Sequence, residues 1–519
     1  MRFRLILVLA LFGLAAPAHA EWWEARTDHF IVYSESSAND ARTFAERLER
    51  FDRALRSLQS IKDAEETDWS RVTVFRTGDI GTMGRLAGGQ GVAGFYIHRH
   101  QGPVAFTPAK NERGEMGARN ADRRTELDPQ TVLFHEYAHH FMYRHFPAAY
   151  PSWYREGFAE AYSTIDLKDD GSFHLGNAPL SRGSAFSSVY FNYSVQRMLL
   201  TERKPDFEDA YGRYTYGWLL THYLTFDPGR QGQLQAYLKL INAGSEPADA
   251  ARKAFGDLGK LEGDVKRYLA GTLPGALVRP ANYVVPSVAM RRLGPDEEAI
   301  IDVRMRSKVG VTRKKAGDVA ADARSVAARY PQSAAVQLAL MEAEFDAENW
   351  DAAERAADAA LAIRPDAVEA LIYKGRVYLA RGRSDPKHYA TARTWLAKAH
   401  AADSTHPSTL YYHYLSYSLA RAPIPESAII GLEQSFVQAP YDEELRLAVA
   451  GQLLAEKDGK VARQILAPLV HSPHESKGAR ALREVFDLVE ANKVDEAYGR
   501  LVAEMAKQEE EKKTGKERD

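Results

Sequence analysis

The chain has 519 residues, which is long for one domain and predicts two or three. Hydrophobic residues make up 45% and charged residues 27% of it, as in globular proteins with a buried core. The formal net charge of −2 and the lack of a strongly basic domain argue against a nucleic-acid-binding protein, so we expect no nucleic-acid partner.

The first 20 residues have the pattern of an export signal. Two arginines, Arg2 and Arg4, precede the apolar run LILVLALFGLAA, which is followed by the small-x-small sequence AHA. The run is short for a bilayer span of about 20 residues. We expect a signal peptide at residues 1–20 and an exported bacterial protein, periplasmic or secreted, without a stable membrane anchor. Its mature chain would begin at Glu21 with a net charge of −4, since −2 minus two arginines gives −4.

The next hundred residues predict a small sheet with a packed helix. Strands are indicated by HFIVYS, RVTVFRT, GFYIH and PVAFTP, and a helix by the apolar spacing of residues 39–58. Glycines around the last two strands favour an antiparallel pair. PVAFTP, residues 103–108, is either an edge strand along which an extended peptide could lie or an ordinary strand.

Residues 128–146 predict a helix that begins at an Asp–Pro cap and contains the sequence HEYAHH. His135 and His139 are one turn apart on one face, so both can reach one metal ion at about 2.0–2.1 Å. Glu136 lies beside them, placed to take a proton from a metal-bound water. His140 is rotated by about 100° around the helix and is expected to take no part. The chain has no cysteine, which excludes thiolate ligands and disulfides.

The third ligand decides the type of site. His145 stands where a metzincin's third histidine falls in H-E-x-x-H-x-x-G-x-x-H, but Met142 replaces the glycine that turns the chain out of the helix. We therefore expect the helix to continue and His145 to point elsewhere. The alternative is Glu156 in YPSWYREGFAEAYS, where 16 intervening residues after His139 allow a turn and an antiparallel second helix.

H-E-x-x-H followed by W-x-x-E-G-F-A-E is similar to the gluzincin metallopeptidases, which include thermolysin-like enzymes and aminopeptidases. It looks most like the exported bacterial branch in which such a domain is joined to tetratricopeptide repeats. The resemblance implies an α+β, zincin-like domain with a small antiparallel or mixed sheet and active-site helices. It also implies one Zn²⁺ ion held by His135, His139 and Glu156, although the loop before Glu156 is shorter than the family's usual spacing.

Two residues near Glu156 support this interpretation. Gly157 inside a helix costs about 1 kcal/mol relative to alanine, which is understandable if another backbone approaches closely there. Glu160, one turn after Glu156, could hydrogen-bond the free ring nitrogen of a ligand histidine, and the alternative is an exposed acidic face.

An oxyanion-stabilising residue is not fixed by the sequence. A further helix, residues 213–224, carries the three candidates Tyr214, Tyr216 and His222. Aromatic residues at helical spacing belong more often to a core than to a site, so the choice stays open.

The remaining chain divides into three parts. Residues 21–275 are expected to form the metallopeptidase domain, mostly helical after Asp128, and residues 276–316 an extended or β connecting segment. Residues 317–507 are alanine-rich, with prolines at intervals of 34, 42, 33 and 33 residues and small residues at Ala353, Ala360 and Gly375. This resembles a tetratricopeptide-repeat solenoid. Residues 508–519 are expected to be a charged, disordered tail.

The predicted function is an exported zinc-dependent peptidase in which a metal-activated water attacks the peptide bond and Glu136 is the general base. The repeats would bind the peptide or protein substrate or a protein partner. The alternative is a non-catalytic periplasmic scaffold of tetratricopeptide repeats with a vestigial or structural metal domain. The intact base and an open coordination position favour catalysis, because structural zinc sites are closed by four protein ligands.

Overall fold

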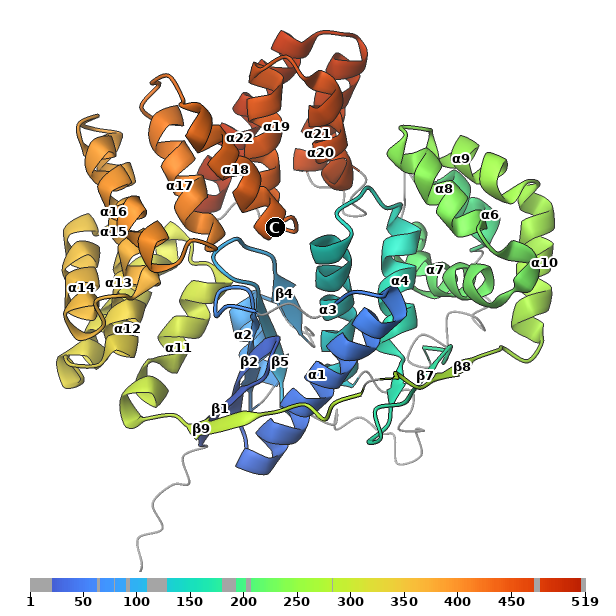
Figure 1. Ribbon diagram of the computed structural model, residues 1–519, viewed down its shortest axis with the longest axis horizontal. Coiled ribbons are helices and arrows are strands. Elements are labelled where there is room, and N and C mark those ends of the chain that lie inside the picture. Colours follow the sequence, from blue (N-terminus) through green and yellow to red (C-terminus); the bar gives the residue numbers. More distant parts are fainter. Residues whose placement is uncertain are drawn as a thin grey trace, which may run out of the picture.

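The computed structural model describes residues 21–62, 66–78, 80–89, 94–109, 128–179, 193–201, 207–281, 283–470 and 477–514. The expected signal peptide, residues 1–20, lies outside them. A mixed sheet and its helices form the centre, a helical subdomain adjoins it, and the C-terminal helices arch over both (Figure 1). Among the described residues, no helix has the length and apolar character needed to cross a membrane.

The central sheet has six strands in the order β4-β5-β3-β2-β1-β9. They are β1 (Trp22–Arg26), β2 (Phe30–Glu35), β3 (Val72–Thr77), β4 (Phe95–Ile97), β5 (Val104–Pro108) and β9 (Ala289–Arg292). The β2–β3 and β3–β5 pairs are parallel and the others antiparallel. The four predicted strands and the antiparallel pairing of β4 with β5 are thus confirmed.

The edge-strand alternative for PVAFTP is wrong. This segment is β5, whose two sides are taken by β3 and β4, so its backbone cannot pair with a further strand. The edge strand on this side of the sheet is β4, the short segment Phe95–Ile97, and β9 is the other edge.

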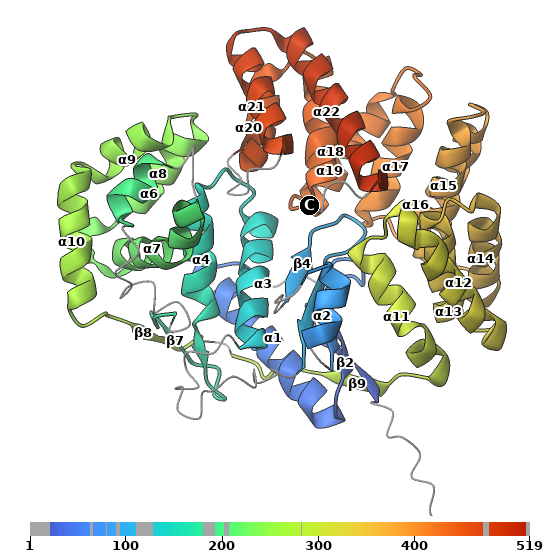
Figure 2. The ribbon, with the colours of Figure 1, turned by 180° about the vertical axis from the view of Figure 1, so that it is seen from behind.

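Helices cover both faces of this sheet because its strands alternate apolar side chains between them. On one face, α1 (Ala38–Gln59) and α3 (Pro129–His145) pack on Phe30, Val32 and Val74. The other face is covered by α2 (Ile80–Ala87) and α11 (Pro295–Val309), which is the side seen in Figure 2. The apolar spacing predicted for residues 39–58 is the buried stripe of α1.

The helical subdomain begins with α4 (Ser152–Ser163), which lies against α3. It continues with α6 (Val195–Leu200), α7 (Phe207–Phe226), the 3₁₀ turn Pro228–Arg230, α8 (Gln233–Asn242), α9 (Pro247–Phe255) and α10 (Leu258–Ala270). Its core contains the fully buried Trp153 and Trp218. A small sheet of order β6-β7-β8 lies beside it, formed by Asp166–Leu167, Phe173–Leu175 and Ala276–Val278.

The connecting segment, residues 276–316, is only partly extended. Its strands β8 and β9 pair with β7 and β1, so the segment belongs to the sheets of the first domain. The expectation that residues 276–316 are extended or β is wrong from Pro295 onward, where α11 begins. Pro295 suits a first helical turn, and the Glu297 carboxylate accepts a hydrogen bond from the Gly294 N–H at 2.9 Å.

The C-terminal region consists of antiparallel helices. They are α12 (Arg313–Arg329), α13 (Ala334–Asp346), α14 (Trp350–Ile363), α15 (Val368–Gly382), α16 (His388–Ala402), α17 (Pro407–Ser418), α18 (Glu426–Gln438), α19 (Glu443–Ala455), α20 (Gly459–Val470), α21 (Lys477–Glu490) and α22 (Val494–Thr514). Ala353 and Ala360 are fully buried, and a Cβ on Gly375 would lie 2.7 Å from Leu396 of the next helix. The small residues therefore stand where helices pack closely, as expected.

The prediction of a disordered tail from residue 508 is wrong as far as residue 514. Helix α22 continues through Thr514, and residues 515–519 lie outside the described part. Residues 508–513 are glutamine, glutamate and lysine, which favour helix, and Lys507 lies 3.9 Å from Glu511 one turn later.

Candidate metal centre

Helices α3 and α4 carry the residues expected to bind metal. The Asp128 side chain caps α3 by accepting a hydrogen bond from the Thr131 N–H at 3.2 Å, and the helix runs through His145. A short turn then leads into α4, which packs along α3 and brings Glu156 beside the histidines. The two helices expected from the sequence are therefore present, and the turn between them is long enough.

Three ligand atoms converge between these helices. The Nε2 atoms of His135 and His139 are 3.2 Å apart. Oε2 of Glu156 lies 3.3 Å from the first and 3.4 Å from the second. Ligands at about 2.0–2.1 Å around a tetrahedral zinc ion are about 3.3–3.4 Å from one another. The three residues thus have the spacing that one such ion requires.

The hydrogen bonding of the cluster also fits a cation. Oε2 of Glu156 is buried and has no hydrogen-bond partner among the described residues, although two ring nitrogens face it. A buried carboxylate oxygen normally receives a hydrogen bond, so an atom left without one marks a place for another partner. A metal ion would satisfy this oxygen and the two Nε2 lone pairs together.

The charges of the cluster are strongly coupled. Burial by itself would lower the pKa of His135, but the carboxylates of Glu156, Glu160 and Glu136 outweigh it and raise the pKa to about 8. Burial would raise the pKa of Glu156, yet the two histidines hold it well below its usual range. The buried carboxylate therefore stays ionised at neutral pH, and a metal ion between the ligands would take the place of the proton on His135.

Glu160 and Glu136 take different places around the histidines. Oε1 of Glu160 lies 3.5 Å from Nδ1 of His135, the ring nitrogen not directed at Glu156. Glu160 is 5% exposed, so the alternative of an exposed acidic face is wrong. Glu136 is half-buried next to His135 on α3. The positions are compatible with an orienting carboxylate and a base, and both roles remain predictions.

Two glycines bring α7 against α4. A Cβ on Gly157 would lie 2.3 Å from the Gly217 carbonyl oxygen, and a Cβ on Gly217 would lie 2.3 Å from the Trp153 carbonyl oxygen. Real Cβ atoms do not approach so closely, so both positions require glycine. The expectation that another backbone approaches at Gly157 is confirmed. One turn before Gly217, the Tyr214 ring lies 5.8 Å from the His135 ring, centroid to centroid.

The other two oxyanion candidates lie away from the histidines. Tyr216 packs against Tyr193, with ring centroids 5.2 Å apart. His222 is 2% exposed, and its ring nitrogens lie 2.7 Å from the Tyr268 hydroxyl and 3.1 Å from the Gly176 carbonyl oxygen. Of the three residues that the sequence left open, the structure brings only Tyr214 to the centre.

His145 and His140 have structural contacts instead. The His145 ring packs on Phe141 at 4.6 Å, and burial with two nearby arginines lowers its pKa to about 3. His140 is buried, with Nδ1 2.5 Å from the Tyr96 hydroxyl. The metzincin alternative is therefore wrong, because α3 does not bend at Met142 and His145 stays on another face.

Strand β4 adds residues that the sequence analysis missed. Tyr96 binds His140, and the Tyr96 and His98 rings lie 4.5 Å apart. Burial, followed by the charge of His139, lowers the pKa of His98 to about 3. Residues two apart share one face of a strand, so the pattern Tyr–x–His in GFYIH was the available signal.

A second histidine–carboxylate cluster lies on the other side of α3. Nδ1 of His29 is 2.8 Å from Oε1 of Glu49 and 3.2 Å from Oδ2 of Asp52. Asp52 also accepts hydrogen bonds from Arg56 and from the Tyr137 hydroxyl, each at 2.6 Å. This cluster was not predicted, because its members come from the turn before β2, from α1 and from α3 and share no sequence motif.

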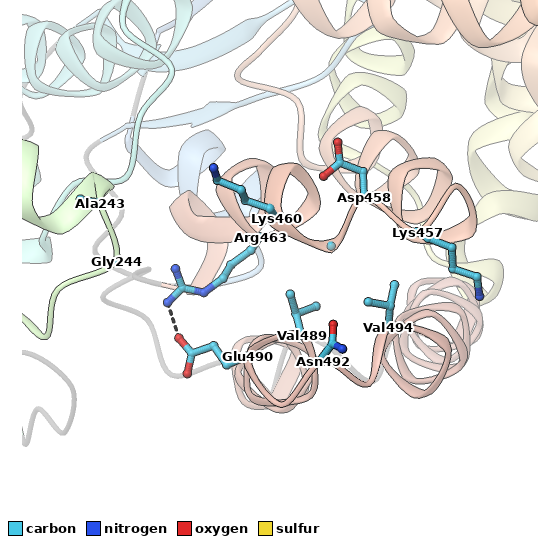
Figure 3. A pocket seen from close by; sticks show the side chains of 11 residues that line it. Ala243, Gly244, Lys457, Asp458, Lys460, Arg463, Val489, Glu490, Asn492 and Val494 are labelled. Atoms are coloured by element: carbon cyan, nitrogen blue, oxygen red, sulfur yellow. Dashed lines mark hydrogen bonds and ion pairs between the residues drawn. The ribbon is translucent and has the colours of Figure 1, made fainter.

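A cavity of about 600 Å³ lies away from both clusters. It is enclosed by the turns before α9, α20 and α22, and Figure 3 shows Lys457, Lys460 and Arg463 around it. None of its lining residues belongs to the metal centre, and the Arg463–Glu490 ion pair at 2.5 Å closes one side.

The centre as a whole can hold one cation between α3 and α4, with a carboxylate and a tyrosine ring beside it. These groups come from three helices, of which α4 packs along α3 and is joined to α7 by the Gly157–Gly217 contact. Comparisons with protein-family models and with curated proteins find no match for this chain.

Proposed function

We propose that the protein is an exported, zinc-dependent peptidase with a zincin-like domain and a C-terminal array of tetratricopeptide-like repeats. The observation that carries the proposal is the triangle of ligand atoms from His135, His139 and Glu156, with sides of 3.2, 3.3 and 3.4 Å. A bound zinc ion supplies Lewis acidity that polarises a carbonyl and lowers the pKa of water from about 15.7 to about 7.

The chain's own residues would move the protons of the reaction. Glu136 takes the proton of the attacking water as its oxygen bonds to the peptide carbon. The C–N bond then breaks, and Glu136 delivers the proton to the leaving amine nitrogen. Glu160 holds the His135 ring by its Nδ1 atom, so that Nε2 keeps its lone pair toward Glu156.

Tyr214 is the group proposed to stabilise the oxyanion. Its ring is beside His135, and a phenol keeps its proton at neutral pH, so that it can donate a hydrogen bond to a developing negative charge. The glycine contact between α4 and α7 supports this role, since it fixes the distance between these two helices about one turn from Tyr214.

The substrate is proposed to be a peptide in extended form along β4. This strand is the edge of the sheet and packs against α3, so its outer N–H and C=O groups can pair with an added strand. Main-chain pairing accepts many sequences, and a peptide or protein segment is the expected substrate class.

The decisive experiment replaces the base and keeps the ligands. A Glu136→Gln variant should lose hydrolysis of a mixed peptide library by more than about 10³-fold while it retains one zinc ion per chain. The matched Glu433→Gln variant changes an exposed glutamate on α18 and should behave as the wild type. Full activity in Glu136→Gln would refute the mechanism. Absence of zinc and of cleavage in the wild type would refute the proposed function.

A further inference from the structure

The turn after β4 is buried in the C-terminal helices. His100, in this turn, is 0% exposed although it lies between two short strands. Its backbone N–H donates to Oδ2 of Asp442 at 2.6 Å, and its Nδ1 lies 2.8 Å from the Ser408 hydroxyl. The next residue, Gln101, donates to the Tyr412 hydroxyl at 2.9 Å. The connection between β4 and β5 is therefore held by α17 and by the turn before α19.

The same turn of the C-terminal region touches the active-site helix. Tyr441, directly before Asp442, packs on His140 with ring centroids 4.7 Å apart. His140 follows the ligand His139 and lies against Tyr96 of β4. The Tyr441 side chain thus contacts α3, and the Asp442 side chain contacts the turn after β4.

Asp442 is specialised for this contact. It is 3% exposed, and its Oδ1 accepts a hydrogen bond from the Leu445 N–H at 2.7 Å as the cap of α19. Its Oδ2 accepts the hydrogen bond from the His100 N–H. One buried carboxylate therefore caps a helix of the array with one oxygen and binds the turn after β4 with the other. Burying a carboxylate is costly unless it is hydrogen-bonded, so the His100 turn and α19 stabilise each other.

Two further contacts anchor the arch at its ends. At its beginning, the Arg304 guanidinium of α11 lies over the Tyr33 ring at 4.7 Å. At its other end, Arg463 of α20 packs against Gly244, where a Cβ would lie 2.6 Å from Nη1 (Figure 3). The arch visible in Figures 1 and 2 is therefore supported at both ends, with the Tyr441–Asp442 turn between them.

We infer that the Tyr441–Asp442 turn is a positioning element that sets the place of edge strand β4 relative to helix α3. The C-terminal helices are then part of the catalytic unit, and their surface at α17 and α19 is occupied by the chain's own His100 turn. The catalytic consequence rests on the proposed peptidase function, because β4 is the strand along which an extended substrate would lie. The positioning itself is a property of the fold and can be measured without activity.

The test uses Asp442→Asn in the full-length mature chain. Asparagine keeps one oxygen to cap α19 but turns an NH₂ group toward the His100 N–H, so donor faces donor. Hydrogen exchange of the amides of residues 95–102 in the zinc-free protein should become at least fivefold faster. The value of kcat/KM for extended peptides should fall about tenfold, mainly through KM, with zinc content unchanged.

Two controls separate this effect from general destabilisation. Ser333→Ala removes a helix cap from α13 near the start of the array, since Ser333 accepts from the Val336 N–H, and should leave exchange at β4 unchanged. Tyr441→Phe keeps the ring on His140 and removes a hydroxyl that has no hydrogen-bond partner among the described residues, so it should match the wild type. Tyr441→Ala should repeat the effect of Asp442→Asn.

The outcomes decide the inference in either direction. Wild-type exchange at residues 95–102 in both Asp442→Asn and Tyr441→Ala would overturn it, as would an equal increase in Ser333→Ala. If the wild type cleaves no peptide, the proposed function fails, and faster exchange confined to β4 still supports the positioning role. If Asp442→Asn does not fold, Ser408→Ala, which removes the hydroxyl beside His100, replaces it in the same comparison.

Discussion

Two clusters of histidine and carboxylate lie on opposite sides of α3, and we propose a metal ion for only one of them. In both, three ligand atoms lie close enough to hold an ion. His29, Glu49 and Asp52 are buried, and Arg56, Arg53 and the Tyr137 hydroxyl donate to their carboxylates. His135, His139 and Glu156 instead surround a carboxylate oxygen that has no hydrogen-bond partner among the described residues.

The difference shows that proximity of ligand types is not sufficient to define a site. A cluster already supplied with donors and cations is a closed structural network, and a metal ion there would have to displace two arginine interactions. Tyr137, inside HEYAHH, donates a hydrogen bond to this network and so holds the face of α3 opposite to the one that carries the ligand histidines. The motif helix thus carries a structural face and a candidate catalytic face, about half a turn apart.

The largest expected effect is the loss of zinc when a ligand of the His135–His139–Glu156 cluster is removed. Removing a member of the His29–Glu49–Asp52 cluster should cause no such loss. His139→Ala should reduce zinc from about one ion per chain to below about 0.1 and abolish peptidase activity, because two ligands cannot hold the ion. The matched His29→Ala variant should keep its zinc. Elemental analysis after gel filtration measures both. Loss of zinc in His29→Ala with retention in His139→Ala would reverse the assignment of the two clusters.

The next largest effect concerns the tyrosine beside His135. Tyr214→Phe should lower kcat about 10²-fold with zinc retained, which is the usual consequence of removing one oxyanion donor. Tyr216→Phe, two residues away in the core, should leave kcat unchanged. Steady-state kinetics on one peptide substrate compares them. Equal rates for Tyr214→Phe and the wild type would exclude Tyr214 from the reaction.

A smaller effect is expected from the carboxylate behind His135. Glu160→Gln should weaken zinc binding about 10- to 100-fold, because the His135 ring loses the partner that fixes its tautomer. A competition titration with a chelator of known affinity measures the change. Glu433→Gln provides the charge-matched control. Unchanged affinity in Glu160→Gln would mean that the 3.5 Å contact does not orient the ring.

The second cluster should affect stability and leave the metal in place. Its neighbours lower the pKa of Glu49 from 4.5 to about 2 and raise that of His29 above 6.5, in both cases against the effect of burial. The Glu49 contribution is present above pH 4.5 and is lost as pH falls toward 2, whereas the His29 contribution is present below pH 6.5 and is lost as pH rises through its raised pKa.

The window of greatest stabilisation is therefore about pH 4.5–6.5. Glu49→Gln should lower the free energy of unfolding by roughly 2–4 kcal/mol there and by less at pH 3 or pH 8.5. Calorimetric unfolding temperatures across this range measure the difference, and zinc content should stay at one ion. A constant difference at every pH would show that Glu49 stabilises the fold without its charge.

Much of the local structure followed from the sequence, because it depends on neighbours along the chain. The cap at Asp128, the apolar stripe of α1 and the pair β4–β5 were predicted by patterns that span fewer than about 20 residues. The helix α11 was missed because the valines and isoleucines after Tyr283 are typical of extended chain, whereas the Gly–Pro start and acidic first turn at residues 294–298 are the signals of a helix. The edge position of β4 was missed because parallel pairing of β5 with β3 joins distant segments.

The sequence by itself determined which residues could bind a metal, since the spacing of His135 and His139 on one helical turn is fixed by helix geometry. It also indicated Glu156 and the need for glycine at Gly157. Only the tertiary structure decided that Tyr214 lies beside them and that Tyr441 and Asp442 contact the surroundings of the centre. It alone also showed that Oε2 of Glu156 has no hydrogen-bond partner within the part of the chain that the structure describes. These facts depend on how close helices from distant parts of the chain approach, which side-chain packing sets and no local pattern records.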